Sequence, residues 1–381
     1  MRPSSCERRA PRVKTPWIPR EARDLGPPHV LRLLNCLTEG SLFVTKLIPR
    51  DYADIKTVGI PRGLLYYRYG TLWKTFFEDL GRIVVVSEET DKAIEEAGDA
   101  ASVDECCLAS KIYLGHVASL IGHCDAIFVP CYASGDHRAG FCTKFQSATD
   151  LVRNTFRDED ARVLPLLIEN VRDKKKTRMA FMDMAFRMGV APRDASAAWN
   201  HAVQAQADRD ARCANTQEET LHLLDEFRRV VERDKTGREE RPLAILLAAH
   251  PYIAHDRFLS GSIVQCIEEM GATVLFADET DHAKAYKASF DFSETLPWTI
   301  NRELIGSILM LRDRIDGIVL VSAFPCGPDS MTDDAVMRCI EGVPILNLMI
   351  DAQSGTAGVQ TRIESFVDIL RFQQKGGYIR G

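Results

Sequence analysis

The sequence predicts an α/β protein made of two parallel-sheet halves that face each other across a cleft, with a charged helical segment between them. Short apolar runs alternate with segments of helical periodicity over residues 57–129, and the same alternation returns from Leu243 onward. The apolar runs are nearly continuous, as in strands that are buried on both faces. Strands that alternate with helices in this way are typical of a parallel sheet with right-handed crossovers.

The first half is predicted over residues 57–150. Its strands are expected at Thr57–Ile60, Ile83–Val86 and Ala126–Val129. Apolar residues at helical spacing predict helices at Leu64–Leu80, Asp91–Ala97 and Leu108–Ile121, and Gly81 and Gly98 directly follow the first two. Residues 130–147 are polar and rich in glycine, and we expect them to form a loop.

Residues 151–241 are highly charged, and we expect a mostly helical bridge there after one apolar piece at Val163–Ile168. The second half, residues 242–381, begins with a strand at Leu243–Ala249. Its further strands are predicted at Thr273–Phe276, Gly317–Val321 and Pro344–Ile350. Its helices are predicted at Phe258–Met270, Asn301–Leu311, a segment reaching about Cys339, and Gln360–Phe372.

Composition narrows the choice of partners. Residues 1–56 carry eleven Lys/Arg against six Asp/Glu and several prolines, so we expect a disordered basic extension. The chain as a whole has a formal net charge of -6. Its body lacks basic blocks and long apolar runs, which argues against nucleic acid and membranes as partners. No secretory signal is evident, so a cytoplasmic setting is predicted.

Eleven cysteines, an odd number at wide spacings, favour metal or redox chemistry over a disulfide framework. Cys106 or Cys107 precedes a predicted helix, Cys142 follows a strand within a loop, and Cys326 lies in a Pro-Cys-Gly-Pro turn after a strand. Such positions favour a thiolate. Three loop thiols with one open position suit an iron–sulfur cluster. Zinc is the competing metal, although no Cys-x-x-Cys occurs.

Other side chains are weaker candidates. Cys131 directly follows a predicted strand and is ambiguous, whereas Cys124, Cys266 and Cys339 lie in apolar or helical contexts and are expected in the core. Three residues are candidates for proton transfer or anion binding. They are His250 at a strand end, Lys111 one turn into a helix, and Asp351 after the last strand. His250 is alternatively interpreted as a ligand or, more simply, as a hydrogen-bonded structural histidine.

Several motifs resemble one known family. They are Gly59–Tyr67, Trp73–Phe77, Asp104–Lys111, Gly115–Val117, Cys142–Phe145, His250–Tyr252, Phe324–Ser330 and Ala357–Asp368. In order and type they resemble the acyl-CoA dehydratase activase-related proteins, which are similar to the iron–sulfur, D-component-type subunits of 2-hydroxyacyl-CoA dehydratases. The likeness spans about residues 57–372. Ala109 and Thr143 stand where that family usually has proline.

The resemblance implies two flavodoxin-like domains with a [4Fe–4S] cluster between them on Cys107, Cys142 and Cys326. It further implies reduction by a separate ATPase activator of the sugar-kinase/actin type. A related subunit or a second copy of the chain, and an acyl-CoA substrate, would complete the system. Cys106 and Cys131 offer extra thiols, so a larger cluster remains open. The alternative is a non-enzymatic electron-transfer or redox-sensing module that holds a cluster or zinc.

Overall fold

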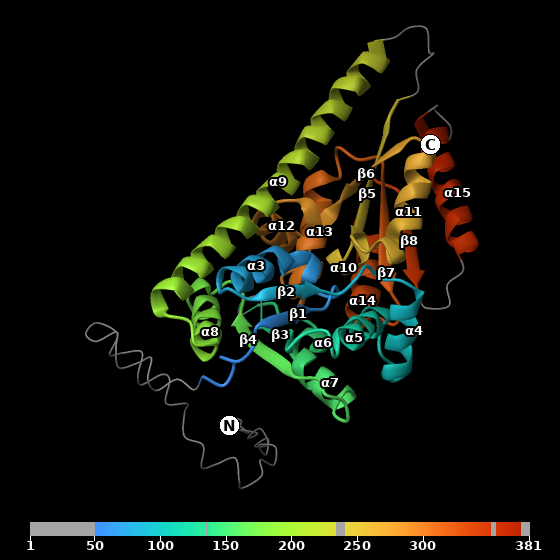
Figure 1. The fold of residues 1–381 in the computed structure, drawn as a ribbon. Helices are drawn as coiled ribbons and strands as arrows, with labels where there is room; N and C mark the ends of the chain where they lie inside the picture. Colours follow the sequence, from blue (N-terminus) through green and yellow to red (C-terminus); the bar gives the residue numbers. More distant parts are fainter. Residues whose placement is uncertain (1–49, 135, 137, 234–240, 352–355, 375–381) are drawn as a thin grey trace, which may run out of the picture. The chain divides into compact units, whose positions relative to one another are not determined.

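The computed structural model describes residues 50–134, 136, 138–233, 241–351 and 356–374. These residues form two four-stranded sheets in which the paired strands run parallel, with helices packed around them (Figure 1). The predicted α/β class is therefore confirmed. Of the predicted basic extension, only residues 50–56 lie within the described part of the chain.

The first sheet has the strand order β2-β1-β3-β4. Its two central strands, β1 and β3, are mostly buried. The elements around it are β1 (Thr57–Ile60), α3 (Tyr66–Asp79), β2 (Ile83–Val86), α4 (Lys92–Ala101), α5 (Leu108–Leu120), β3 (Ala126–Ser134), α6 (Thr143–Gln146), α7 (Ala148–Thr155), β4 (Val163–Asn170) and α8 (Lys174–Arg187).

Two features of this half differ from the sequence prediction. The strand β3 continues to Ser134, so the predicted loop at 130–147 begins five residues later and contains the short helix α6. The strand continues because β4 pairs with it as far as Asn170. The first sheet thus takes its fourth strand from the segment 151–241, whose apolar piece at Val163–Ile168 is sheet rather than bridge.

The second sheet repeats the same order, β6-β5-β7-β8. All seven residues of β5 and of β7 are buried, which explains why both read as continuous apolar runs. The elements are β5 (Leu243–Ala249), α10 (Pro251–Ala254), α11 (Arg257–Glu269), β6 (Ala272–Phe276), η3 (Ala277–Glu279), α12 (His282–Ala288), η4 (Ser289–Asp291), α13 (Thr299–Leu311), β7 (Gly317–Ala323), α14 (Gly327–Cys339), β8 (Ile345–Ile350) and α15 (Thr356–Gln374).

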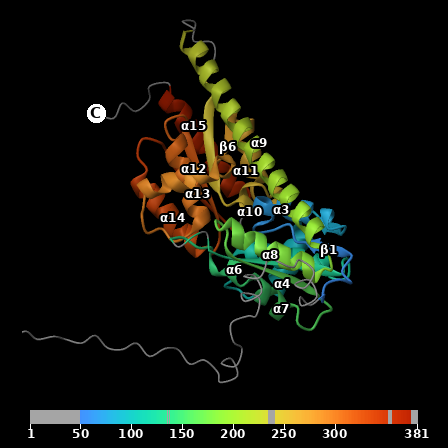
Figure 2. The same cartoon turned by 90° about the vertical axis from the view of Figure 1, so that its left-hand side faces the viewer.

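The helix α9 (Pro192–Arg233) connects the two sheets over 42 residues, and both views show it running alongside them (Figures 1 and 2). Two of its glutamines accept hydrogen bonds from backbone N–H groups, one in each half of the chain. Gln206 Oε1 accepts from the N–H of Leu72 in α3 at 3.0 Å, and Gln217 Oε1 accepts from the N–H of Phe276 in β6 at 2.7 Å. None of the helices within the described ranges combines the length and apolar character needed to cross a bilayer.

The carboxyl ends of the two sheets contact each other through backbone hydrogen bonds. Leu108 N–H, at the start of α5, donates to Phe324 O after β7 at 2.9 Å. Gly140 exchanges two further bonds with the segment before α13, at 2.8 Å each, through Pro297 O and Thr299 N–H. These bonds join the start of α5 to the turn after β7, and the loop after β3 to the start of α13.

Candidate functional site

The three cysteines singled out by the sequence occupy equivalent positions. Cys107, Cys142 and Cys326 are the N-cap residues of α5, α6 and α14, with extended backbone and no side-chain capping bond. The first turn of a helix leaves backbone N–H groups without partners, and its dipole favours negative charge. The backbone N–H groups at these three positions therefore favour negative charge on the thiols, although burial opposes it at Cys142 and Cys326.

All three cysteines lie near enough to the buried Tyr252 to affect the pKa of its hydroxyl. Burial, the Asp329 carboxylate and the thiols of Cys326, Cys107 and Cys142 together raise the pKa of Tyr252 well above its ordinary value. Cys142 and Cys326 also line one small cavity with Tyr252. The structure thus brings together side chains from both sheets that lie more than 200 residues apart in the sequence.

Burial sets the protonation of two of these thiols. It raises the pKa of Cys142, although the backbone N–H groups of Lys144 and Phe145 favour the thiolate. Burial and then the neighbouring Asp329 raise the pKa of Cys326 far above its ordinary value. Both groups are therefore thiols at neutral pH, and binding a metal group would have to release their protons.

The remaining thiols have their own surroundings. Cys106 is buried, and Lys144 Nζ donates to its sulfur at 3.4 Å. Cys131 lies inside β3, where its sulfur contacts Thr149 Oγ1 at 3.2 Å and accepts from Thr149 N–H at 3.3 Å. Packing accounts for Cys131. Cys339 is exposed, so the expectation that it lies in the core is wrong, because the last turn of α14 faces solvent.

His250 lines the same small cavity as Cys142 and Cys326. It is the N-cap of α10 and stacks on Tyr252 with ring centroids 5.0 Å apart. Its Nε2 lies 2.8 Å from Asp329 Oδ1. Burial disfavours the cation, but Asp329 outweighs it and raises the pKa of His250. The same pairing, against the opposing effect of burial, lowers the pKa of Asp329.

Two residues of this network were missed by the sequence reasoning. Asn301 Nδ2 donates to Asp329 Oδ1 at 2.7 Å and to Thr332 Oγ1 at 3.0 Å, which orients the carboxylate beneath Cys326. The position of Asp329, three residues after an N-cap cysteine, was a usable signal for it. Asn301 carried none, since only the packing of α13 against α14 brings it there.

A comparison with protein families places this chain. The model described as "CoA enzyme activase uncharacterised domain (DUF2229)" matches residues 57–279, which is more than half of the 381 residues. The chain belongs to this activase-domain family. The matched range contains Cys107, Cys142 and His250, and it ends before Cys326.

No curated protein matches this activase-domain chain. Among solved structures, it is similar to the C-terminal domain of glucosamine-fructose-6-phosphate aminotransferase from Francisella tularensis. That match has 10% sequence identity and a TM-score of 0.23, and it covers 86% of this chain and 87% of that one.

Lys111 and Asp351 line a larger cavity of about 550 Å³ beside the thiols of the activase-domain chain. Its wall includes Cys106, Leu108 and Pro325, which are sequence neighbours of Cys107 and Cys326. Lys111 Nζ donates to Asp99 Oδ1 at 2.6 Å, and this bond raises the pKa of Lys111. Lys111 therefore reaches the cavity as a paired cation.

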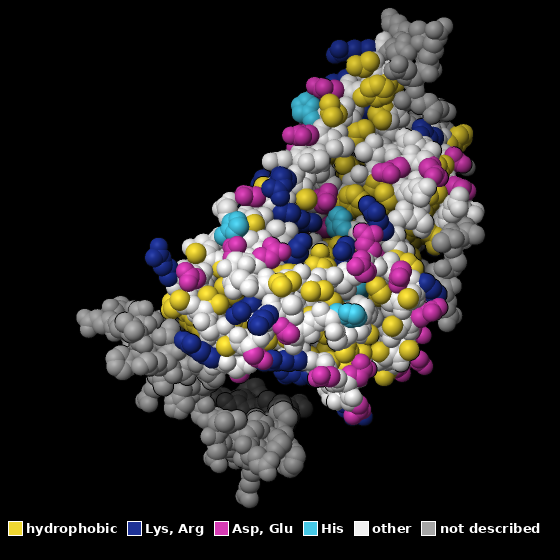
Figure 3. All heavy atoms as spheres, viewed as in Figure 1, with side chains coloured by type: hydrophobic (Ala, Val, Ile, Leu, Met, Phe, Trp, Pro, Cys, Tyr) yellow, Lys and Arg dark blue, Asp and Glu magenta, His cyan; other side chains and the backbone are white. Residues whose placement is uncertain are grey.

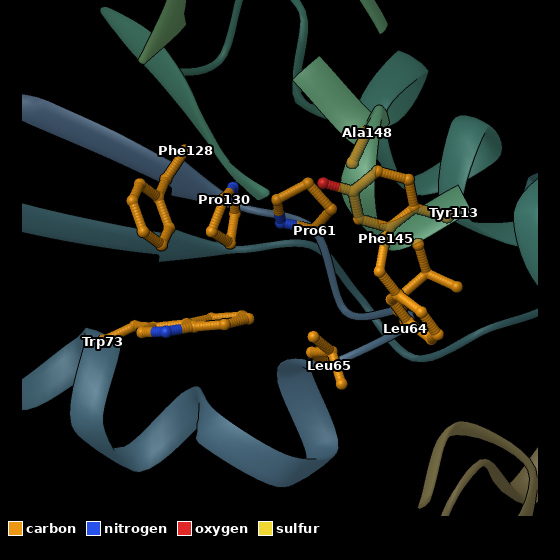
Figure 4. Close-up of a pocket in the computed structure, with 10 residues that line it drawn as sticks. Pro61, Leu64, Leu65, Trp73, Tyr113, Phe128, Pro130, Phe145 and Ala148 are labelled. Carbon is orange, nitrogen blue, oxygen red and sulfur yellow. The ribbon is translucent and has the colours of Figure 1, made fainter. Parts of the chain in front are cut away.

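An apolar layer of the first half of the chain packs against α6, the helix that begins after Cys142. Figure 4 shows the side chains of Phe145 and Tyr113 next to each other, with Trp73 packed under Phe128 and Pro130. Phe145, the buried residue of α6, anchors that short helix in the layer. The position of the Cys142 N-cap is thus fixed by packing against the first sheet.

Within the described ranges, no group of three or more His, Cys, Asp or Glu side chains is arranged to hold one metal ion.

On the face shown in Figure 3, acidic and basic side chains are interspersed over the part of the surface that is described.

Proposed function

We propose that this chain holds a [4Fe–4S] cluster on Cys107, Cys142 and Cys326 and acts as an electron-accepting component in the 2-hydroxyacyl-CoA dehydratase superfamily. The proposal is supported by three N-cap thiols whose charge acts on the same buried side chain, Tyr252. It is consistent with the activase-domain family match. We infer a lyase or reductase role on a substrate linked to CoA, in the cytoplasm.

The residues suit the group chemically. Thiolates are the usual ligands of iron–sulfur clusters, and the three helix N-termini lower the cost of concentrating negative charge. When bound, the cluster would supply low-potential one-electron transfer. The protein's own part would be to exclude water with the Tyr252 ring and to hold a proton between His250 Nε2 and Asp329. The cavity of about 550 Å³ beside the thiols is the place we assign to a substrate.

We further propose a flavodoxin-like architecture for both halves, with the site in a cleft between them. The support is the shared strand order, in which the second strand, the first, the third and the fourth are neighbours. Thiols at the carboxyl ends of strands fit the usual place of ligands in open α/β sheets. The predicted divisions at 57–150, 151–241 and 242–381 belong to this proposal.

The partners belong to the proposal as well. A low-potential electron would come from an ATPase activator of the sugar-kinase/actin type. A related dehydratase-like subunit or a second copy of this chain would complete the enzyme.

Cluster binding is tested by anaerobic purification with iron and sulfide assays and an optical spectrum. We expect about four irons per chain and their loss in Cys326→Ser. The matched control is Cys339→Ser, at the other end of the same helix, which should keep its iron because Cys339 is exposed. Stoichiometric zinc without visible absorbance in the wild type would refute the proposal.

A turnover assay distinguishes an enzymatic role from a role as an electron carrier. The reduced protein is offered 2-hydroxyacyl-CoA esters, alone and with a partner subunit. Dehydration of any ester supports the enzymatic role. A loaded cluster with no turnover in either condition would favour the non-enzymatic electron-transfer module.

A further inference from the structure

The long helix α9 exposes an apolar face near its C-terminal end. Leu223, Phe227 and Val230 are 66%, 46% and 56% exposed. Their spacing of four and then three residues places them on one face of the helix, and we call these three side chains the α9 patch. Figure 3 shows hydrophobic side chains gathered at the upper end of α9 as Figure 1 places it. Single exposed apolar side chains are ordinary, but a contiguous group of them is typical of an interaction surface.

The same part of α9 already buries another face. Leu221 and Leu224 belong to the hydrophobic core. The buried Arg228 donates to Pro242 O and to the carboxylate of Asp316, which directly precede β5 and β7. These contacts fix the rotation of the helix about its own axis, so the helix cannot turn the α9 patch inward. A helix that is apolar on two faces is normally covered on both.

Charged side chains form a row along one flank of the α9 patch. Glu219, Glu226 and Arg233 recur every seven residues, and Arg229 lies beside this row. The row is acidic in its N-terminal part and basic in its C-terminal part. Two such rows attract each other when their helices run antiparallel, because each acidic part then lies opposite a basic part. In a parallel pair, like charges would face each other.

We propose that the α9 patch is a self-association surface, on which the α9 helices of two copies of this chain pack antiparallel about a two-fold axis near Phe227. Leu223 of one copy then packs against Val230 of the other. Glu219 of each copy lies opposite Arg233 of the other. A two-fold interface brings the same surface of both copies together, so the surface must be complementary to itself. An apolar centre with a rim that is half acidic and half basic meets that requirement.

The surface lies at the opposite end of the second sheet from the candidate site. Arg228 fastens this part of α9 beside the amino-terminal ends of β5 and β7, whereas His250 and Cys326 follow their carboxyl ends. Self-association through α9 would therefore leave the thiols and the cavity of about 550 Å³ accessible. The inference rests on α9 alone and does not depend on the proposed function.

Sedimentation velocity of the full-length chain without a cluster, over a range of concentrations, tests the surface. We expect a monomer–dimer equilibrium, and Phe227→Glu should raise the Kd of the dimer by about 30-fold or more. The control is Val203→Glu. Val203 is 41% exposed on the same helix, but it has no exposed large hydrophobic neighbour along that helix, so its Kd should equal that of the wild type. A wild type that is monomeric at every concentration, or an unchanged Kd in Phe227→Glu, would overturn the proposal.

A charge exchange tests the antiparallel arrangement. Glu219→Arg places an arginine opposite Arg233 of the second copy and should raise the Kd by about tenfold. Adding Arg233→Glu should restore the wild-type Kd, because both ion pairs form again with their signs reversed. A double variant that dimerises no better than Glu219→Arg would refute this arrangement. Far-UV circular dichroism checks that each variant folds, and all the substituted side chains are exposed.

Iron content separates this inference from the proposed function. Phe227→Glu should bind as much iron as the wild type, because the α9 patch lies at the other end of the sheet from the thiols. A dimer in a chain that binds no iron leaves the self-association surface standing while the cluster proposal fails. An iron-loaded wild type that stays monomeric overturns the self-association surface and leaves the cluster proposal standing.

Discussion

Gly115→Ala should separate α4 from α5 and displace the helix that begins after Cys107. A Cβ at residue 115 would lie 1.9 Å from Ile94 O, and a Cβ at Gly98 on the facing helix would lie 1.9 Å from Lys111 O. Ordinary contact begins near 3.4 Å, so the helices must move apart by about 1.5 Å. Because the obstacle is backbone, no side-chain rotation relieves it.

The expected loss follows from two opposing effects. Overpacking costs about 1–3 kcal/mol where side chains can shift, and a rigid backbone clash belongs at the upper end, about 3 kcal/mol. Alanine in place of a helical glycine returns about 1 kcal/mol through helix propensity. The net destabilisation is therefore about 2 kcal/mol.

Urea unfolding followed by far-UV circular dichroism measures this difference. The control is Gly261→Ala in α11, where the new Cβ would make only an ordinary contact at 3.7 Å. That variant should be neutral or stabilised by up to about 1 kcal/mol. If Gly115→Ala unfolds at the same urea concentration as Gly261→Ala, the close approach of α4 and α5 is refuted.

Three further predictions concern buried polar groups. Burial lowers the pKa of His116 from 6.5 to about 4. As the pH falls, the imidazole is therefore protonated in the unfolded chain before it is protonated in the folded chain. The free energy of unfolding, measured with urea, should fall by up to about 3 kcal/mol between pH 6.5 and pH 4. Glu303→Gln leaves Arg68, 3.4 Å away, without its buried counter-charge, and a loss of about 3–5 kcal/mol in thermal unfolding is expected. Asp256→Ala removes the α11 N-cap and the hydrogen-bond acceptor for Thr90, and this should lower the free energy of unfolding by about 3 kcal/mol. Wild-type stability of Glu303→Gln or of Asp256→Ala would contradict the corresponding prediction.

The strands were predictable because local pattern alone encodes them. The run Leu243–Ala249 is apolar at every position, and β5 has those same bounds. The extent of β3 was not predictable, because Pro130 interrupts its apolar run and the next residues, Cys131–Ser134, are held in the sheet by pairing with β4, which is a tertiary contact. Helix α9 is recognisable as helical from its charge pattern, but its single 42-residue span depends on packing against α3 and η3.

The candidate site, too, was predictable only where local sequence carries the signal. The Pro-Cys-Gly-Pro turn identified Cys326 as a candidate, and the sequence indicated that Cys107 and Cys142 lie near strand or helix ends. The contact of Asp329 with His250 joins residues 79 positions apart, so no local pattern could contain it. The burial that raises the pKa values of Cys142 and Cys326 is likewise a property of packing.

The backbone bond between Leu108 N–H and Phe324 O joins the residue after Cys107 to the turn before Cys326. Two of the three thiols are thus positioned by one contact between the sheets, while Cys142 depends on the apolar layer around Phe145. Displacing α5 would move Cys107 relative to Cys326 but leave Cys142 in place. A group held by all three thiols would then resist that displacement, so ligand binding and the packing of α4 on α5 should stabilise each other.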